Sequence, residues 1–113
     1  MSTHAHLRLV RSGGLAGIAT EAEIDTADID PREADEVLAG LDSVDLWSLA
    51  RRPPAPPGPP DAFRYVLEVE RGDAQHRIAL AEAEIPPALR PVLAVLSRRA
   101  RPARRVDREE PRE

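Results

Sequence analysis

The chain has 113 residues, of which 42% are hydrophobic and 32% charged, and this length and balance predict one small globular domain. The absence of cysteine excludes disulfide scaffolds, thiol nucleophiles and cysteine-ligated zinc. The net charge of −4 is unevenly distributed: Glu21 to Asp45 has ten acidic residues and one arginine, whereas Arg98 to Glu113 has seven arginines and four acidic residues. So short a chain leaves room for one modest core, which favours a small binding module over a deep active site.

No stretch approaches the roughly 20 apolar residues that cross a bilayer, and the first residues lack the apolar segment of a signal peptide. With the missing cysteines, this predicts a cytoplasmic protein that contacts no membrane. The arginines cluster in a proline-containing terminal stretch rather than over a folded surface, so nucleic acid is not an expected partner. We expect residues 1–5 to be a flexible N-terminus and residues 98–113 to be a disordered tail.

Residues 6–25 show the pattern of a β-hairpin. Apolar residues alternate with polar ones over 6–10 and again over 18–24, as in strands with one buried face. The pair Gly13–Gly14 can adopt the positive φ angles of a tight reversal. The predicted connection between the two strands is Ser12–Gly17.

The next segment predicts an amphipathic helix. Asp30 is typical of an N-cap, Pro31 fits the first helical position, and Glu33 is placed to complete a capping box. Apolar residues then recur at helical spacing with carboxylates opposite, at Ala34, Val37, Leu38 and Leu41. We expect this helix to pack against a sheet.

A short helical turn, Val44–Ala50, follows the helix. We expect its Leu46, Trp47 and Leu49 to be the bulkiest anchors of the core, with partner binding as the alternative role of Trp47. The segment Pro53–Pro60 is excluded from helix and central strand, because proline lacks the N–H donor and biases the preceding residue toward extended conformations. We interpret it as a stiff connector within one domain, and a polyproline ligand for an SH3-like domain is the alternative.

The second half predicts another hairpin and another helix. Apolar residues alternate from Phe63 to Val69, Gly72 and Asp73 mark the reversal, and the apolar face continues on the return strand at Ile78 and Leu80. The last helix opens at Pro86 and Pro87, and Pro91 predicts an irregular or 3₁₀ start. Its apolar stripe is Leu89, Val92, Leu93 and Leu96.

These elements predict an α+β fold for residues 6–97. The order is strand, strand, helix, strand, strand, helix (ββαββα). Two hairpins in that order can pair into a four-stranded antiparallel sheet with both helices packed on one face.

The chain has no recognisable catalytic motif. It lacks a nucleophile elbow, an HExxH pair and a glycine-rich loop followed by lysine, since it has no lysine. The carboxylates between Glu21 and Asp45 fall on faces predicted to be solvated, where no pocket raises a pKa. We therefore predict a protein that is not an enzyme and has no cofactor.

The histidines leave a metal site as an alternative. His4 and His6 would share one face of a strand and could chelate a metal, and Ser2–His4 with a free amino terminus would match a square-planar Cu(II) site. Our interpretation is that these are solvated terminal histidines and that the protein has no metal site. We expect His76 to be an edge or cross-strand residue at the start of the fourth strand.

Two segments resemble the emfourin family most specifically, RSGGLAG at Arg11–Gly17 and PPALRPVL at Pro86–Leu93, and the similarity extends over about Leu7 to Leu96. Emfourins are small bacterial protein inhibitors of protealysin-like, thermolysin-type (M4) zinc metalloproteases, commonly encoded next to the protease gene. Many relatives have an aromatic residue where this chain has Leu15. The resemblance implies protease inhibition as the activity and an M4-type protease as the partner.

An inhibitor of this kind needs a stiff loop rather than a catalytic group. Thermolysin-like enzymes favour a bulky apolar residue just after the cleavage point, and Leu15 offers one within a slim, glycine-flanked segment. The predicted protease-binding residues are Ser12, Gly13, Gly14, Leu15, Ala16 and Gly17. The alternative is that the glycines only turn the chain while Leu15 caps the core. The predicted second contact is the rigid connector, at Pro56, Pro57, Gly58 and Pro59.

Two other classes of function stay open. One is a non-enzymatic interaction module that recruits a partner through its acidic face or basic tail. The other is a small enzyme or metal carrier that uses His4 and His6.

Overall fold

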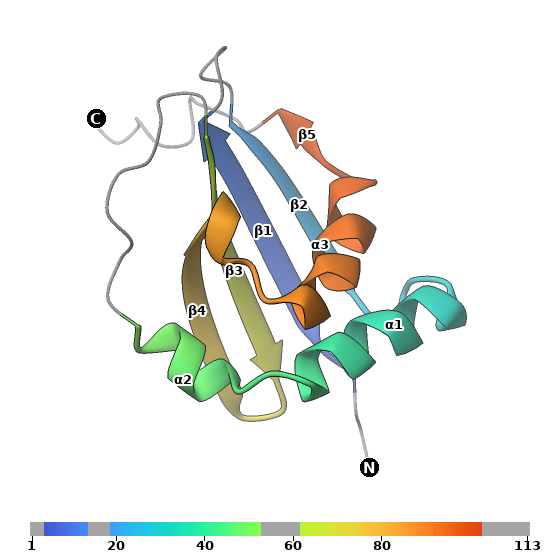
Figure 1. Ribbon diagram of the computed structural model, residues 1–113. Helices are drawn as coiled ribbons and strands as arrows, with labels where there is room; N and C mark the ends of the chain where they lie inside the picture. Colours follow the sequence, from blue (N-terminus) through green and yellow to red (C-terminus); the bar gives the residue numbers. More distant parts are fainter. Residues whose placement is uncertain (1–3, 14–18, 53–61, 103–113) are drawn as a thin grey trace, which may run out of the picture.

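The computed structural model describes residues 4–13, 19–52 and 62–102. Alternating apolar residues form strands, and segments with apolar residues three and four apart form helices, which lie together on one face of the sheet (Figure 1). In chain order the elements are β1 (His6–Gly13), β2 (Thr20–Asp25), α1 (Pro31–Asp42), α2 (Leu46–Ala50), β3 (Phe63–Arg71), β4 (Ala74–Ala81), the 3₁₀ turns η1 (Glu82–Glu84) and η2 (Pro87–Leu89), α3 (Arg90–Ser97) and β5 (Arg101–Pro102).

The sheet is antiparallel, in the order β4-β3-β1-β2-β5. The predicted α+β class, both hairpins and the helices on one face are confirmed, and β1 joins the hairpins by pairing with β2 and β3. The predicted count of four strands is wrong, because β5 adds a fifth, and the predicted order ββαββα omits both β5 and α2. A two-residue strand shows no alternation, so the sequence pattern carries no signal for it.

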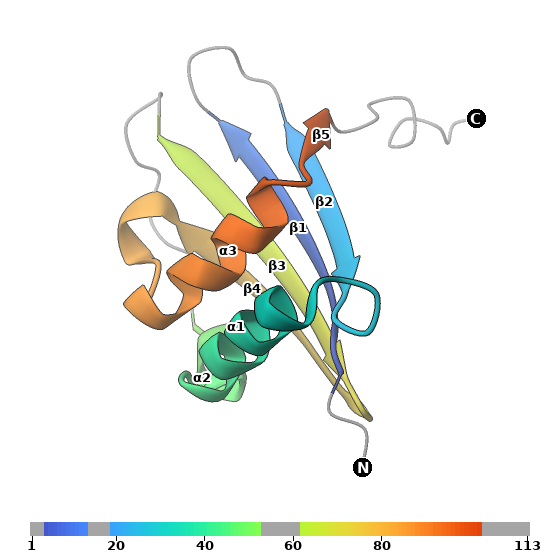
Figure 2. The ribbon, with the colours of Figure 1, turned by 90° about the vertical axis from the view of Figure 1, so that its right-hand side faces the viewer.

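The core lies between the sheet and the helices (Figure 2). The predicted apolar faces are confirmed, and the largest fully buried side chains are Leu7, Leu41, Leu67, Ile78, Leu89, Leu96, Val37, Val69, Val92 and Val95. Gly40 allows α1 to approach α3, since a β-carbon there would lie 2.6 Å from Cγ2 of Val92 and 2.7 Å from the carbonyl oxygen of Ala88. The predicted 3₁₀ start of the last helix is confirmed by η2.

Helix α1 begins as its sequence predicts, with one exception. The Asp30 carboxylate accepts a hydrogen bond of 2.8 Å from the backbone N–H of Arg32, and Pro31 occupies the first turn. The predicted capping box is wrong, because the Glu33 carboxylate binds Arg98 and Arg99 instead of the backbone at the start of the helix. Two guanidinium groups from the other end of the chain provide charge-assisted hydrogen bonds that a backbone N–H cannot match.

Helix α2 corrects the prediction for Trp47. Leu46 and Leu49 are half-buried against the core, whereas Trp47 is 62% exposed and therefore not a core anchor. Positions 46 and 49 share a helix face and position 47 lies about 100° away, so the two leucines take the inner face. The guanidinium carbon of Arg51 lies 5.3 Å from the centroid of the Trp47 ring, a distance typical of a cation–π contact.

The described fold extends beyond both ends of the predicted domain 6–97. Ala5 is fully buried; its N–H donates to Oγ1 of Thr26 at 2.8 Å, and its carbonyl accepts from the Thr26 N–H at 2.9 Å. At the other edge the chain runs through Arg98 and Arg99 into β5. No helix in the described part of the chain is long and apolar enough to cross a membrane.

Candidate functional site

The predicted protease-binding residues begin at the end of β1. Ser12, which is exposed, and Gly13 are the last two residues of this strand, and they pair with Arg64 and Phe63 of β3. The remaining loop residues, Gly14, Leu15, Ala16 and Gly17, lie outside the described residues. The predicted second contact, Pro56, Pro57, Gly58 and Pro59, also lies outside them.

Gly13 brings the flanks of the two predicted contact segments together. Its φ angle is +100°, a backbone conformation that residues other than glycine rarely adopt. A β-carbon at this position would clash with the carbonyl oxygen of Ala62, the first described residue after the proline-rich connector. The last described residue before the loop and the first described residue after the connector are therefore in contact.

An aromatic contact that the sequence did not reveal lies beside Gly13. The guanidinium carbon of Arg11 is 4.5 Å from the centroid of the Phe63 ring, within the range of a cation–π interaction. The backbone N–H of Phe63 also donates to Oε1 of Glu82 at 3.2 Å. This end of the sheet is thus tied together across β1, β3 and η1.

A fourth segment reaches the same end of the sheet, where β5 pairs with the start of β2 (Figure 2). Arg101 lies opposite Glu21, and Pro102 lies opposite Thr20. Thr20 is the first residue of β2 and follows the predicted loop by three positions. Proline suits this position because an edge strand has one side on which no N–H is needed. We call the set Arg11, Ser12, Gly13, Thr20, Ala62, Phe63, Arg101 and Pro102 the loop end of the sheet.

Glu33 holds the segment that leads into β5. Its carboxylate oxygens lie 2.5 Å from Nη1 of Arg98 and 2.7 Å from Nη2 of Arg99. The hydrogen bond from Arg99, with the charges of Arg99 and Arg98, holds the pKa of Glu33 below its usual range. Arg99 also donates to the carbonyl oxygen of Val95 at 3.0 Å, which ties it to the last turn of α3.

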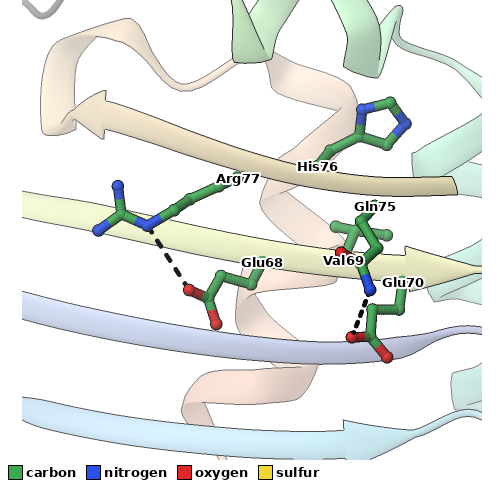
Figure 3. Close-up of a pocket in the computed structure, with 6 residues that line it drawn as sticks. All are labelled: Glu68, Val69, Glu70, Gln75, His76 and Arg77. Atoms are coloured by element: carbon green, nitrogen blue, oxygen red, sulfur yellow. Dashed lines mark hydrogen bonds and ion pairs between the residues drawn. The ribbon is translucent and has the colours of Figure 1, made fainter.

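The open face of the sheet carries charged side chains that pair across the strands. Nη2 of Arg8 lies 3.1 Å from Oε1 of Glu21, and Nη1 of Arg8 lies 3.7 Å from Oε1 of Glu68. Nε2 of His6 lies 2.7 Å from Oε2 of Glu23. Glu68 also contacts Arg77 at 3.5 Å (Figure 3). Exposed pairs of this kind stabilise a fold by about 0–1 kcal/mol each, so we interpret this face as a solvated surface.

Most carboxylates of the acidic stretch have partners within the chain. Glu21, Glu23 and Glu33 form the ion pairs described above. Oδ1 of Asp42 lies 2.7 Å from Nη1 of Arg71. Asp45 caps α2 and accepts from the side chain and the backbone of Ser48, which lowers its pKa. A partner that bound this stretch through charge would compete with these contacts.

The histidines do not belong to a cluster of metal ligands among the described residues, and the alternative Cu(II) site at Ser2–His4 lies partly outside those residues. His4 and His6 line a surface hollow with Asp25, Glu70 and Gly72, but no group of three or more potential ligands in residues 4–13, 19–52 and 62–102 could hold a metal ion. His76 lies on β4, an edge strand, as predicted. It lines a surface hollow together with Glu68 and Glu70, and its ring points away from these two carboxylates (Figure 3).

Comparison with known proteins gave a match to a protein family. The family model described as Emfourin matches residues 9–97, which include the predicted loop, the connector and the helices α1, α2 and α3. No curated protein and no solved structure matches the chain. Since the family model covers most of the sequence, the chain belongs to the Emfourin family.

Proposed function

We propose that the protein inhibits a thermolysin-like, protealysin-type (M4) zinc metalloprotease by placing the Ser12–Gly17 loop in the active-site cleft. The observation that carries this proposal is the Emfourin match over residues 9–97, because it favours an inhibitor rather than an enzyme. The proposed target is a protease of the same cell, encoded by a neighbouring gene. The missing cysteines keep the cytoplasm as the proposed compartment.

The position of β1 supports the choice of loop. The strand that enters the loop pairs with β2 as far as Arg11 and with β3 as far as Gly13, so the sheet holds it up to its last residue. A fixed loop loses less conformational entropy on binding than a free one, and an inhibitor gains affinity in this way. The close approach of Gly13 to Ala62 adds a third constraint.

The chemistry of the loop supports an apolar anchor. Leu15 is the one large apolar side chain between the glycines at 13, 14 and 17. We propose that it occupies the apolar specificity pocket of the protease, while the small neighbours let the backbone enter a narrow cleft. The connector residues Pro56–Pro59 are the proposed second contact, because the connector returns to the sheet at Ala62 beside Gly13.

A titration tests the proposal. Purified protein is added to an M4-type protease with a fluorogenic peptide substrate, first to the protease of the neighbouring gene. We expect activity to fall in proportion to added protein until the two are equimolar. Full protease activity in the presence of excess folded protein would overturn the proposed function.

The Leu15→Asp variant then tests the loop. A charge in an apolar pocket costs several kcal/mol unless it is paired, so inhibition should weaken by at least about 100-fold. The matched control is Ala79→Asp, which adds the same charge at an exposed position of β4. Equal inhibition by the two folded variants would show that the loop is not the contact.

A further inference from the structure

The segment from Ser97 to Pro102 lies on the domain without burying a side chain. All six of its residues are exposed, whereas Val95 and Leu96, directly before it, are fully buried. Burial of apolar surface, the main driving force of folding, therefore contributes little to the placement of this segment. Polar contacts and strand pairing hold it instead.

Glu33 provides two of these polar contacts. From the first turn of α1, its carboxylate oxygens lie 2.5 Å from Nη1 of Arg98 and 2.7 Å from Nη2 of Arg99. Arg99 also donates to the carbonyl oxygen of Val95, so its guanidinium group is held between α1 and α3. Glu33 thus fixes the direction in which the chain leaves α3.

Strand β5 follows at once and lies along β2 at the end of α3 (Figure 2). It consists of Arg101, which pairs with Glu21, and Pro102, which pairs with Thr20. Proline has no N–H to donate to the ladder, and so short a pairing is not stable by itself. The docking of β5 therefore depends on the contacts that Glu33 makes just before it.

Strand β2 in turn is the strand that leaves the predicted contact loop. Thr20 and Glu21, its first two residues, pair with Arg11 and Val10 of β1 on one side and with β5 on the other. With β5 docked, the start of β2 is an inner strand. Without β5 it would be an edge strand with one side unpaired, and such positions open more readily.

We propose that Glu33 is a positioning residue of the inhibitor: it holds β5 on β2, and through β5 it fixes the strand that leaves the Ser12–Gly17 loop. The effect on inhibition rests on the proposed function, whereas the docking of β5 is a property of the free protein. Pairing with β3 holds the entering strand as far as Gly13. A loop that is fixed at both ends loses less conformational entropy when it binds.

Hydrogen exchange measured by mass spectrometry on the free protein tests the docking of β5. Glu33→Gln removes the charge and keeps the size of the side chain. The matched control is Asp42→Asn, which removes another ion pair of α1, to Arg71 of β3, at the opposite end of the helix. In Glu33→Gln we expect exchange of residues 19–22 and 99–101 to rise about three- to tenfold relative to β3, the range for exposed ion pairs. The control should leave this ratio unchanged.

Inhibition constants test the positioning role. We expect Glu33→Gln to weaken inhibition of the protease by about three- to tenfold and Asp42→Asn to leave it unchanged. The double variant Arg98→Gln, Arg99→Gln should reproduce the effect of Glu33→Gln, and combining all three substitutions should add nothing further, because one set of contacts is lost in each case. A merely structural role would lower the melting temperature and leave the inhibition constant unchanged.

The outcomes separate the two proposals. Unchanged exchange at the start of β2 in Glu33→Gln would show that Glu33 does not hold β5, and the inference would be wrong. If exchange rises there but inhibition equals that of the wild type, the positioning role is wrong and the inhibitor function stands. If the wild type does not inhibit at all, the proposed function and the positioning role fall together, and exchange alone decides whether Glu33 holds β5.

Discussion

Gly13 lies directly against the carbonyl oxygen of Ala62, with a backbone φ of +100° and no room for a β-carbon. We predict that Gly13→Ala destabilises the fold by about 1–3 kcal/mol from backbone strain, with a further cost from the clash. Urea unfolding measures the loss. Gly72→Ala is the matched control, because Gly72 has φ +61° and a β-carbon added there would meet no atom within 4 Å, so only strain applies. A smaller loss for Gly13→Ala than for Gly72→Ala would contradict this account.

Gly40 gives a second test of close packing. A methyl group there gains about 0.5–1 kcal/mol of helix propensity but overpacks the contact of α1 with α3, which costs about 1–3 kcal/mol. We therefore expect Gly40→Ala to lower the free energy of unfolding. Adding Val92→Ala removes the nearer of the two obstacles, and the double variant should lose less than the sum of the single variants. Additive losses would show that Gly40 and Val92 do not share this contact.

The ion pairs of Glu33 predict a pH dependence. Its folded-state pKa is lowered, so the stabilisation is present above the ordinary glutamate pKa of about 4.3 and is lost as pH falls through the lower folded value. Thermal melts of wild type and Glu33→Gln should differ most near neutral pH and converge in acid. Glu36→Gln should run parallel to the wild type across that range. A difference that grew on acidification would contradict the assigned contacts.

Trp47 predicts an unusual fluorescence signal for a sole tryptophan. Because its side chain is 62% exposed, we expect emission typical of water-exposed indole in the folded protein and strong quenching by iodide. Trp47→Ala should change the free energy of unfolding by about 0.5 kcal/mol or less, since exposed positions tolerate substitution. A blue-shifted emission that iodide does not quench would show that Trp47 is buried, and would contradict this prediction.

The fold was largely predictable because its main elements depend on local patterns. Alternation revealed the strands of both hairpins, and Asp30 with Pro31 revealed the start of α1. The misses have different physical causes. The carboxylate of Glu33 binds two arginines 65 and 66 residues away, which no local pattern reveals. Trp47 is exposed because Leu46 and Leu49 share the inner face of the helix, and a prediction from side-chain size alone does not take this spacing into account.

Only the start of the candidate site lies within the described residues. The pair Gly13–Gly14 predicted a reversal, and Gly13 has the positive φ that a reversal requires. The stacking of Arg11 on Phe63 and the pairing of β5 with β2 join segments that are far apart in the chain, so only the three-dimensional structure reveals them. The contact of Leu15 with a protease stays a prediction.

The central place of β1 bears on what would follow if a protease cut the proposed contact loop. If the bond next to Leu15 were hydrolysed, one new chain end would follow β1, which is paired with β2 and β3. The other new end would lead into β2. Neither end could diffuse away without opening a whole ladder of hydrogen bonds. The strands on both sides of the cut would therefore stay paired in the sheet, and a nicked molecule would keep its fold.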